Sequence, residues 1–215
     1  MTLTRDLPLV PAQSALLFID VQNFNVTAAG GEYAGMEPAA VEARYGWHFR
    51  LLERETVPNM QRLQRACRAA GVEVLYSTIE SLTRDGRDRS LDYKITGFNV
   101  PKGSWDGRVI EAIAPAEDEI WLPKTSSSVF VSTHIDYILR NLGVRQLAIA
   151  GLLTDQCIES AIRDACDLGY LVTQVTDACA TLTQERHDNS LRAIKGYCRQ
   201  VTTEQLVTEL AAAGS

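Results

Sequence analysis

A short run ending in a cysteine carries the side chain of this sequence best suited to nucleophilic chemistry. The run reads GLLTDQC over residues 151–157 and follows an apolar stretch, 144–150, typical of a buried strand. Apolar residues recur with helical spacing over 158–168, so the pattern places Cys157 in the first turn of a helix. Unpaired N–H groups and the helix dipole favour a thiolate there, so we expect the thiol pKa to fall from roughly 8.5 toward neutrality.

Two further polar side chains follow predicted strands. Asp20 ends the apolar run ALLFID, and Lys124 comes directly after EIWLP. Because the carboxyl ends of strands in a wound parallel sheet lie on one edge, we expect Asp20, Lys124 and Cys157 to converge. A carboxylate there would take the thiol proton and return it to a leaving amine, while an ammonium keeps the carboxylate ionised. Taken singly, each residue has an ordinary alternative role: Asp20 as a turn cap, Lys124 as a surface charge and Cys157 as a thiol packed in the core.

The elements that must position these residues alternate between strands and helices. The patterns predict strands over 15–20, 72–78, 119–122, 144–150, 170–176 and 199–202, and helices over 57–70, 133–142, 158–168, 185–196 and 203–212. This alternation indicates an α/β fold, a doubly wound, mostly parallel six-stranded sheet with helices on both faces. Two long segments, 21–50 and 81–106, leave the carboxyl ends of strands, and we expect them to be loops that form the pocket walls.

Composition narrows the function classes. The chain has 215 residues, 46% of them hydrophobic, which fits a single domain over 1–215 with one large core. A net charge of −6 and the lack of a long Lys and Arg cluster argue against nucleic acid as a partner. The N-terminal segment matches neither a signal peptide nor a membrane span, so we expect a cytoplasmic protein without a membrane partner. Five cysteines without a CxxC pair favour neither a disulfide framework nor a thiolate zinc site.

Three motifs together resemble the cysteine hydrolase branch of the isochorismatase-like superfamily. They are DVQN at 20–23, LPK at 122–124 with SVF at 128–130, and GLLTDQC at 151–157; the resemblance spans roughly residues 14 to 200. It implies a Rossmann-like three-layer fold, an Asp20–Lys124–Cys157 triad, no cofactor and a homo-oligomer, either a dimer or a tetramer. It also implies a cis peptide between Leu152 and Leu153, and an oxyanion hole formed by the backbone N–H groups of Leu153 and Cys157.

Within this superfamily the sequence is most similar to amidohydrolases. Nicotinamidases carry an aspartate–x–histidine metal motif, whereas the histidines of this chain, His48, His134 and His187, do not form one, so we predict no metal. Isochorismatases proper cleave a vinyl ether and lack the cysteine. The segment KGSWD at 102–106 resembles that of ureidoacrylate amidohydrolases, and N-carbamoylsarcosine amidases and biuret hydrolases share the triad. We therefore expect a covalent acyl-enzyme on Cys157 that cleaves the C–N bond of a small ureido, carbamoyl or carboxamide substrate, releasing ammonia or an amine.

Candidate pocket residues lie in the segments that follow the strands: Asn23, Phe24, Glu80, Trp105, Phe130 and Gln156. A carboxylate such as Glu80 would accept hydrogen bonds from a substrate NH₂ group, whereas Arg84, Arg87 or Arg89 would suit a substrate carboxylate. The three aromatic side chains have core packing as an equal alternative.

Two other functions remain open on the same fold. One is a small-molecule binding protein without turnover, because a fold does not guarantee activity. The other is a redox-sensing thiol at Cys157, with Cys179 or Cys198 as the partner that approaches it in space.

Overall fold

The computed structural model describes residues 4–213, so positions 1–3 and 214–215 of the predicted domain lie outside the described residues. One parallel sheet of six strands forms the middle of the molecule, in the order β3-β2-β1-β4-β5-β6. The strands are β1 (Ser14–Ile19), β2 (Glu73–Ile79), β3 (Ile120–Lys124), β4 (Gln146–Leu152), β5 (Leu171–Ala180) and β6 (Arg199–Val201). This order, with β1 and β4 side by side at the centre, confirms the doubly wound α/β sheet.

Helices connect the strands and cover the sheet. The α-helices are α1 (Asn23–Val26), α2 (Pro38–Leu51), α3 (Val57–Ala70), α4 (Leu91–Ile95), α5 (Val129–Ser132), α6 (Ile135–Asn141), α7 (Glu159–Asp167), α8 (Gln184–Ile194) and α9 (Thr203–Ala213). Two π-helical turns, η3 (Leu52–Thr56) and η5 (Thr154–Ile158), precede α3 and α7, and short 3₁₀ turns are η1 (Pro11–Gln13), η2 (Gly31–Tyr33) and η4 (Glu111–Ile113). Within the described residues, no helix is both long enough and apolar enough to cross a membrane.

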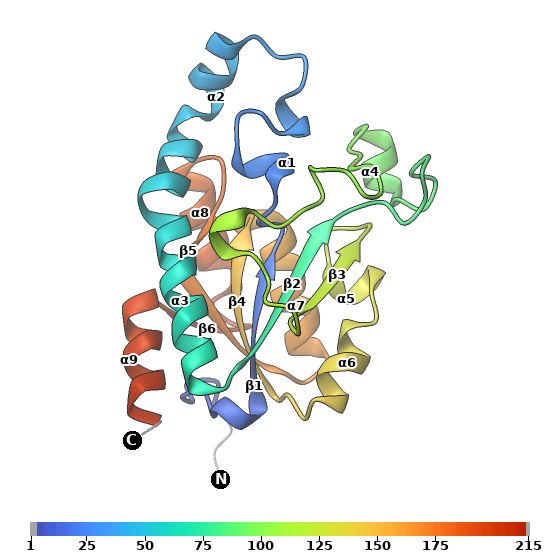
Figure 1. The fold of residues 1–215 in the computed structure, drawn as a ribbon. Coiled ribbons are helices and arrows are strands. Elements are labelled where there is room, and N and C mark those ends of the chain that lie inside the picture. The colour runs from blue at the N-terminus through green and yellow to red at the C-terminus, as the bar shows by residue number, and fades with distance from the viewer. Residues whose placement is uncertain (1–3, 214–215) are drawn as a thin grey trace.

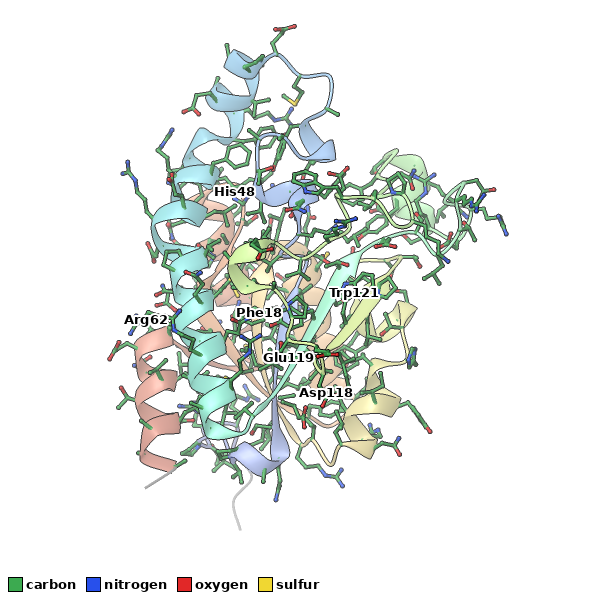
Figure 2. The ribbon with its side chains drawn as sticks, in the orientation of Figure 1. Phe18, His48, Arg62, Asp118, Glu119 and Trp121 are labelled. Atoms are coloured by element: carbon green, nitrogen blue, oxygen red, sulfur yellow. The ribbon has the colours of Figure 1, made fainter. Side chains whose placement is uncertain are left out.

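The two faces of β1 build the two halves of the core. Leu17 and Ile19 belong to a buried cluster with α6 and α7, whereas Leu16 and Phe18 belong to a second cluster with α3 and α9. This alternation is the period of two that a strand imposes, and it gives the three-layer arrangement seen in Figure 1. In the layer formed by α3 and α9, an ion pair joins Arg62 of α3 to Glu204 of α9 (Figure 2).

The prediction of a loop over 21–50 was wrong, because α2 occupies its second half. Proline begins this helix, and Val41, Tyr45 and His48 bury one face of it at spacings of three and four residues. Histidine is polar by type and the tyrosine ring carries a hydroxyl group, so the buried face does not form a clear apolar pattern in the sequence. His48 lies on the inner side of α2, where its Nδ1 is 2.9 Å from the carbonyl oxygen of Thr181 (Figure 2). The segment 81–106 is irregular as predicted, apart from the short helix α4.

All six strands point the same way, so their carboxyl ends share one edge of the sheet. Figure 1 shows α1, α2 and α4 gathered beyond this edge, with the two chain ends at the opposite side. Residue pairing fixes the edge at atomic level: Ile19 of β1 is opposite both Ser77 and Gly151, and Ile79 of β2 is opposite Lys124 of β3. Side chains that follow these positions therefore meet above the centre of the sheet.

Candidate active site

Asp20 follows the last residue of β1 in an unusual backbone conformation. Its φ is 57°, and it is the sole non-glycine residue with positive φ among residues 4–213. Its N–H donates to the carbonyl oxygen of Ser77 at 2.7 Å, which holds this conformation at the edge of the sheet. The side chain is 1% exposed. A left-handed, fully buried aspartate is costly, and such outliers concentrate at functional sites.

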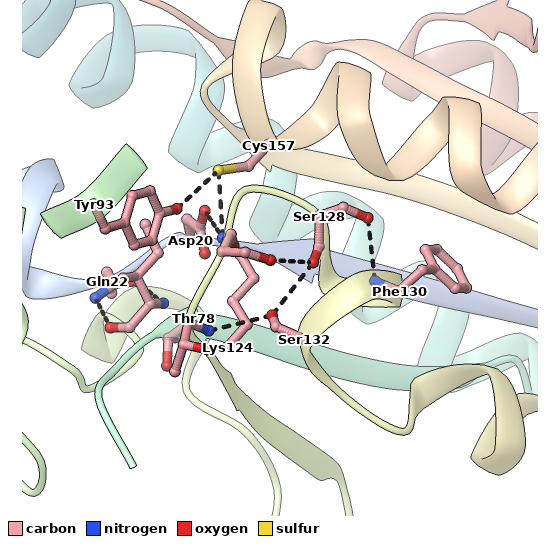
Figure 3. Close-up of polar contacts among 12 residues, drawn as sticks. Asp20, Gln22, Thr78, Tyr93, Lys124, Ser128, Phe130, Ser132 and Cys157 are labelled. Atoms are coloured by element: carbon pink, nitrogen blue, oxygen red, sulfur yellow. Dashed lines mark hydrogen bonds and ion pairs between the residues drawn. The ribbon is translucent and has the colours of Figure 1, made fainter. Parts of the chain in front are cut away.

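Lys124 ends β3 and joins the other two predicted residues. Its Nζ lies 3.0 Å from Oδ2 of Asp20, donates to Sγ of Cys157 at 3.3 Å and donates to the carbonyl oxygen of Ser126 at 2.8 Å. The side chain is completely buried. The ammonium group thus makes two hydrogen bonds and one ion pair, and its nitrogen bridges the carboxylate and the sulfur (Figure 3).

Cys157 lies in η5, the single π-helical turn between β4 and α7. The turn starts directly after Leu153, and the Leu152–Leu153 peptide is cis. Sγ points back toward the ends of β1 and β3 (Figure 3), and 5% of the residue is exposed. The structure therefore brings together Asp20, Lys124 and Cys157, which are more than a hundred residues apart at the extremes.

Burial dominates the ionisation of this cluster. Desolvation and, to a smaller extent, the charge of Asp20 raise the pKa of Cys157, Lys124 opposes both, and the net result is a pKa of about 12. The expected fall of this pKa toward neutrality is thus wrong, because a helix terminus offsets only part of the loss of water around a buried anion. Burial also raises the pKa of Asp20, against the lowering charge of Lys124. Burial alone would lower the pKa of Lys124, but Asp20 and Cys157 outweigh it and raise that pKa.

The raised pKa values of Cys157 and Lys124 indicate a neutral thiol beside a protonated ammonium, which forms an ion pair with Asp20. Neither carboxylate oxygen of Asp20 has a hydrogen bond of good geometry with a described donor, so Lys124 acts on it mainly as a nearby charge. An aspartate with a raised pKa and open lone pairs is a better base than a solvated one. The cluster can therefore move the proton of Cys157 to Asp20 as the sulfur attacks a carbon, while Lys124 balances the negative charge.

Two residues of the site were missed by the sequence analysis. Gln22 is fully buried; its Oε1 accepts from the N–H of Ile79 at 2.7 Å, and its Nε2 donates to the carbonyl oxygens of Ile79 and Asp106 at 2.9 and 3.1 Å. It fixes the end of β1 against β2. Tyr93 of α4 places its hydroxyl oxygen 3.9 Å from Sγ of Cys157 (Figure 3). The motif DVQN included Gln22 without a role, and Tyr93 lay in a predicted pocket wall.

Comparison with known proteins identifies the family of this chain. A family model described as the isochorismatase domain matches residues 14–205, a span that includes Asp20, Lys124 and Cys157. The chain belongs to the isochorismatase family. The match confirms the resemblance that the three motifs carry.

Relatives of this isochorismatase-family hydrolase include amidohydrolases. Ureidoacrylate amidohydrolase RutB of Rhizobium rhizogenes is 29% identical over 187 residues, which cover 79% of this chain and 71% of that protein. RutB of Agrobacterium fabrum is 28% identical over 186 residues, covering 79% and 77%. A cysteine hydrolase from Pseudomonas syringae pv. phaseolicola has the same fold with a TM-score of 0.80, at 24% identity and 96% coverage of each chain. N-carbamoylsarcosine amidase from Thermoplasma acidophilum matches with a TM-score of 0.68, at 24% identity and coverages of 89% and 97%.

The predicted pocket residues of this family member fall into two groups. Two of them bond to the segment that follows Val100: Asn23 Nδ2 donates to the carbonyl oxygen of Trp105 at 3.0 Å, and Glu80 Oε1 accepts from the N–H of Gly103 at 2.9 Å. Their polar groups therefore hold that segment in this structure. The others are aromatic or exposed: Phe24 is buried in the same cluster as Cys157, the Phe130 ring lies tilted 6.0 Å from that of Tyr170, and Trp105 and Gln156 are exposed.

The candidate anion-binding arginines differ in their contacts. Arg87 forms an exposed ion pair with Asp85, and Arg84 is exposed. Arg89 is half-buried and donates to the carbonyl oxygens of Gly86 and Phe98, each at 2.8 Å. Arg89 thus braces the turn that carries α4.

The remaining cysteines and histidines do not join the cluster. Sγ of Cys179 and Sγ of Cys198 donate to different backbone carbonyl groups, those of Ile149 and Ile194. Cys157 instead contacts Lys124 and Tyr93, and every cysteine in the described part of the chain is a free thiol. Over residues 4–213, no three His, Cys, Asp or Glu side chains are grouped so as to hold a metal ion, and the metal-free site stays a prediction.

Proposed function

We propose that this protein is a cysteine-dependent amidohydrolase that cleaves the C–N bond of a small ureido, carbamoyl or carboxamide substrate. The observation that carries the proposal is the bridge made by Lys124, whose Nζ lies 3.0 Å from Oδ2 of Asp20 and 3.3 Å from Sγ of Cys157. A nucleophile, a base and a balancing cation in mutual contact are what acyl transfer through a covalent intermediate requires.

The first half-reaction forms the acyl-enzyme. Sγ of Cys157 bonds to the carbonyl carbon while its proton moves to Asp20, and the carbonyl electron pair moves onto oxygen. The backbone N–H groups of Leu153 and Cys157 are the proposed donors to this oxyanion, each contributing about 3 kcal/mol to the lowering of the barrier. When the carbonyl reforms, the C–N bond breaks and Asp20 gives its proton to the departing nitrogen, so ammonia or an amine leaves.

The second half-reaction returns the free enzyme. Asp20, again a carboxylate, takes a proton from water as the water oxygen bonds to the acyl carbon. Collapse of this second tetrahedral intermediate breaks the S–C bond, and the sulfur recovers its proton from Asp20. Lys124 keeps its proton throughout, since neighbouring negative groups raise its pKa.

Ureidoacrylate-like compounds are the first candidates for the substrate. Two RutB proteins named as ureidoacrylate amidohydrolases are relatives at 28 and 29% identity, and the segment KGSWD at 102–106 resembles theirs. The proposed pocket is completed by Asn23, Phe24, Glu80, Trp105, Phe130 and Gln156. Asp20, Lys124 and Cys157 are each at most 5% exposed, which favours a small planar group at the sulfur.

A panel of ureido acids, carbamoyl amino acids and simple carboxamides tests the proposal through ammonia release. The wild-type protein is expected to hydrolyse at least one class, and a slow carbamoyl substrate should add its acyl mass to the peptide that contains Cys157. Cys157→Ala should lose at least three orders of magnitude in turnover and keep its fold. Cys166→Ala, on the neighbouring helix α7, is the matched control and should retain activity. Equal turnover in both variants would end the proposal of nucleophilic catalysis and favour a binding protein.

A further inference from the structure

One side chain at the sulfur has no part in the reaction described so far. Tyr93 is 6% exposed, and its hydroxyl oxygen lies 3.9 Å from Sγ of Cys157, within hydrogen-bond reach of a sulfur atom (Figure 3). Three titratable groups from three elements therefore face Sγ: Asp20 beyond β1, Lys124 of β3 and Tyr93 of α4.

The position of Tyr93 is fixed by several contacts of α4. The Ser90 side chain caps this helix by accepting from the N–H of Tyr93 at 3.3 Å, and the N–H of Ser90 donates to the carbonyl oxygen of Thr125 at 2.9 Å. Thr125 directly follows Lys124, so α4 is tied to the strand that carries the ammonium. The Tyr93 ring also contacts Phe98 at 5.0 Å between centroids. The hydroxyl is thus held at the sulfur by backbone and ring contacts.

The sulfur needs a second donor when it becomes an anion. Lys124 also donates to Ser126 and forms an ion pair with Asp20, so it offers the sulfur a single hydrogen bond. A buried thiolate with one donor keeps most of its desolvation cost, and each further hydrogen bond to an anion is worth more than one between neutral groups. Burial raises the pKa of Tyr93, so its phenol stays protonated and able to donate.

We propose that Tyr93 is a catalytic residue of this site, whose hydroxyl donates a hydrogen bond to Sγ of Cys157 whenever the sulfur carries negative charge. The role rests on the proposed nucleophilic function of Cys157. The hydrogen bond from Tyr93 acts at two points: when the proton of Cys157 is on Asp20, and when Sγ of Cys157 leaves the acyl carbon. Tyr93 also belongs to an aromatic cluster with Phe98 and Phe24, whose rings are 4.8 Å apart.

Alkylation of Cys157 by iodoacetamide tests this role independently of any substrate. The tryptic peptide 146–163 contains Cys157 as its only cysteine, so its mass reports that residue alone. Below the thiol pKa the alkylation rate is proportional to the thiolate fraction, and Tyr93→Phe should lower it about tenfold at each pH, equivalent to about one unit of pKa. The value of kcat on an active substrate should fall by a similar factor, with KM little changed.

Tyr170→Phe is the matched control, because Tyr170 is 5% exposed and loses a hydroxyl bonded to Asp136 instead of to the sulfur. Its alkylation rate should equal that of the wild type. If Tyr93 only packed over the sulfur, Tyr93→Phe would leave the alkylation rate of Cys157 unchanged or increase it. Either result would overturn the proposal. Wild-type protein without ammonia release on the whole panel would refute the amidohydrolase, while the alkylation comparison would still decide the role of Tyr93. Complete resistance of wild-type Cys157 to alkylation would count against both.

Discussion

Gly151 of β4 lies directly opposite Ile19 of β1, and no side chain fits between them. A Cβ at Gly151 would lie 2.1 Å from the carbonyl oxygen of Ile19 and 2.8 Å from its nitrogen, and the φ of Gly151 is +132°. This close approach of two backbones stands directly before Asp20 on one strand and before the cis peptide and Cys157 turn on the other. The base and the nucleophile therefore both follow strand ends that meet at this contact.

Gly151→Ala is therefore expected to destabilise the fold and the site together. The added methyl group meets backbone atoms that cannot rotate away, so we expect a loss of about 4 kcal/mol or more in the free energy of unfolding, or failure to fold. Gly196→Ala is the control, because a Cβ there meets no atom within 4 Å. Urea unfolding of both variants measures the difference. A Gly151→Ala variant as stable as Gly196→Ala would contradict the close approach.

The site residues at the carboxyl ends of strands could be predicted from the sequence. Those in irregular segments between strands could not. Asp20 and Cys157 follow strongly apolar strands and Lys124 ends β3, and parallel strands place such residues on one edge. Tyr93 lies in a segment without periodicity, so nothing in the sequence marked it out. The pKa of Cys157 was misjudged because helix position is local, whereas burial is set by the whole fold. The roles of the pocket residues and the predicted oligomer stay predictions.

The pH dependence of turnover should report the base. Burial raises the pKa of Asp20 above its ordinary 3.8, and catalysis needs the carboxylate, so kcat/KM should fall as pH falls through that raised pKa. The charge of Lys124 lowers this pKa. Its removal in Lys124→Met should therefore raise the pH of the acid limb, where the residual kcat/KM falls, by about one pH unit or more. Lys195→Met removes an exposed charge at the end of α8 and should leave the limb in place. An acid limb at the same pH in all three proteins would exclude Asp20 as the titrating group.

The buried ion pair between Lys124 and Asp20 should also contribute to the free energy of unfolding. Lys124→Met leaves Asp20 buried without its cation, and breaking such a pair costs about 3 to 5 kcal/mol. The pKa of Asp20 in the folded variant then rises further above its unfolded value. A raised folded pKa stabilises the protein below the unfolded value of 3.8 and loses that stabilisation as pH rises through the folded one.

The deficit of Lys124→Met relative to wild type should accordingly be larger at about pH 8 than at about pH 4.5. Adding Asp20→Asn removes the unpaired charge, so the double variant should recover part of the loss at the higher pH. Urea unfolding of the wild type, both single variants and the double variant at the two pH values measures these differences. Strict additivity of the two substitutions at both values would mean that the pair is not coupled.

Access to Cys157 should depend on the turn that carries α4. Arg89 holds this turn through three backbone carbonyl groups, with Nε donating to Gly86 at 2.8 Å and one terminal nitrogen donating to Phe98 and Tyr93 at 2.8 and 3.5 Å. Arg89→Ala removes all three contacts, so α4 should open more often and expose the sulfur, which is 5% exposed in the closed structure. We expect alkylation of Cys157 to accelerate several-fold, opposite in sign to the effect of Tyr93→Phe. Arg87→Ala, which loses an exposed ion pair with Asp85 in the same segment, should alkylate at the wild-type rate. Equal rates for the two arginine variants would show that the brace formed by Arg89 does not control access to the sulfur.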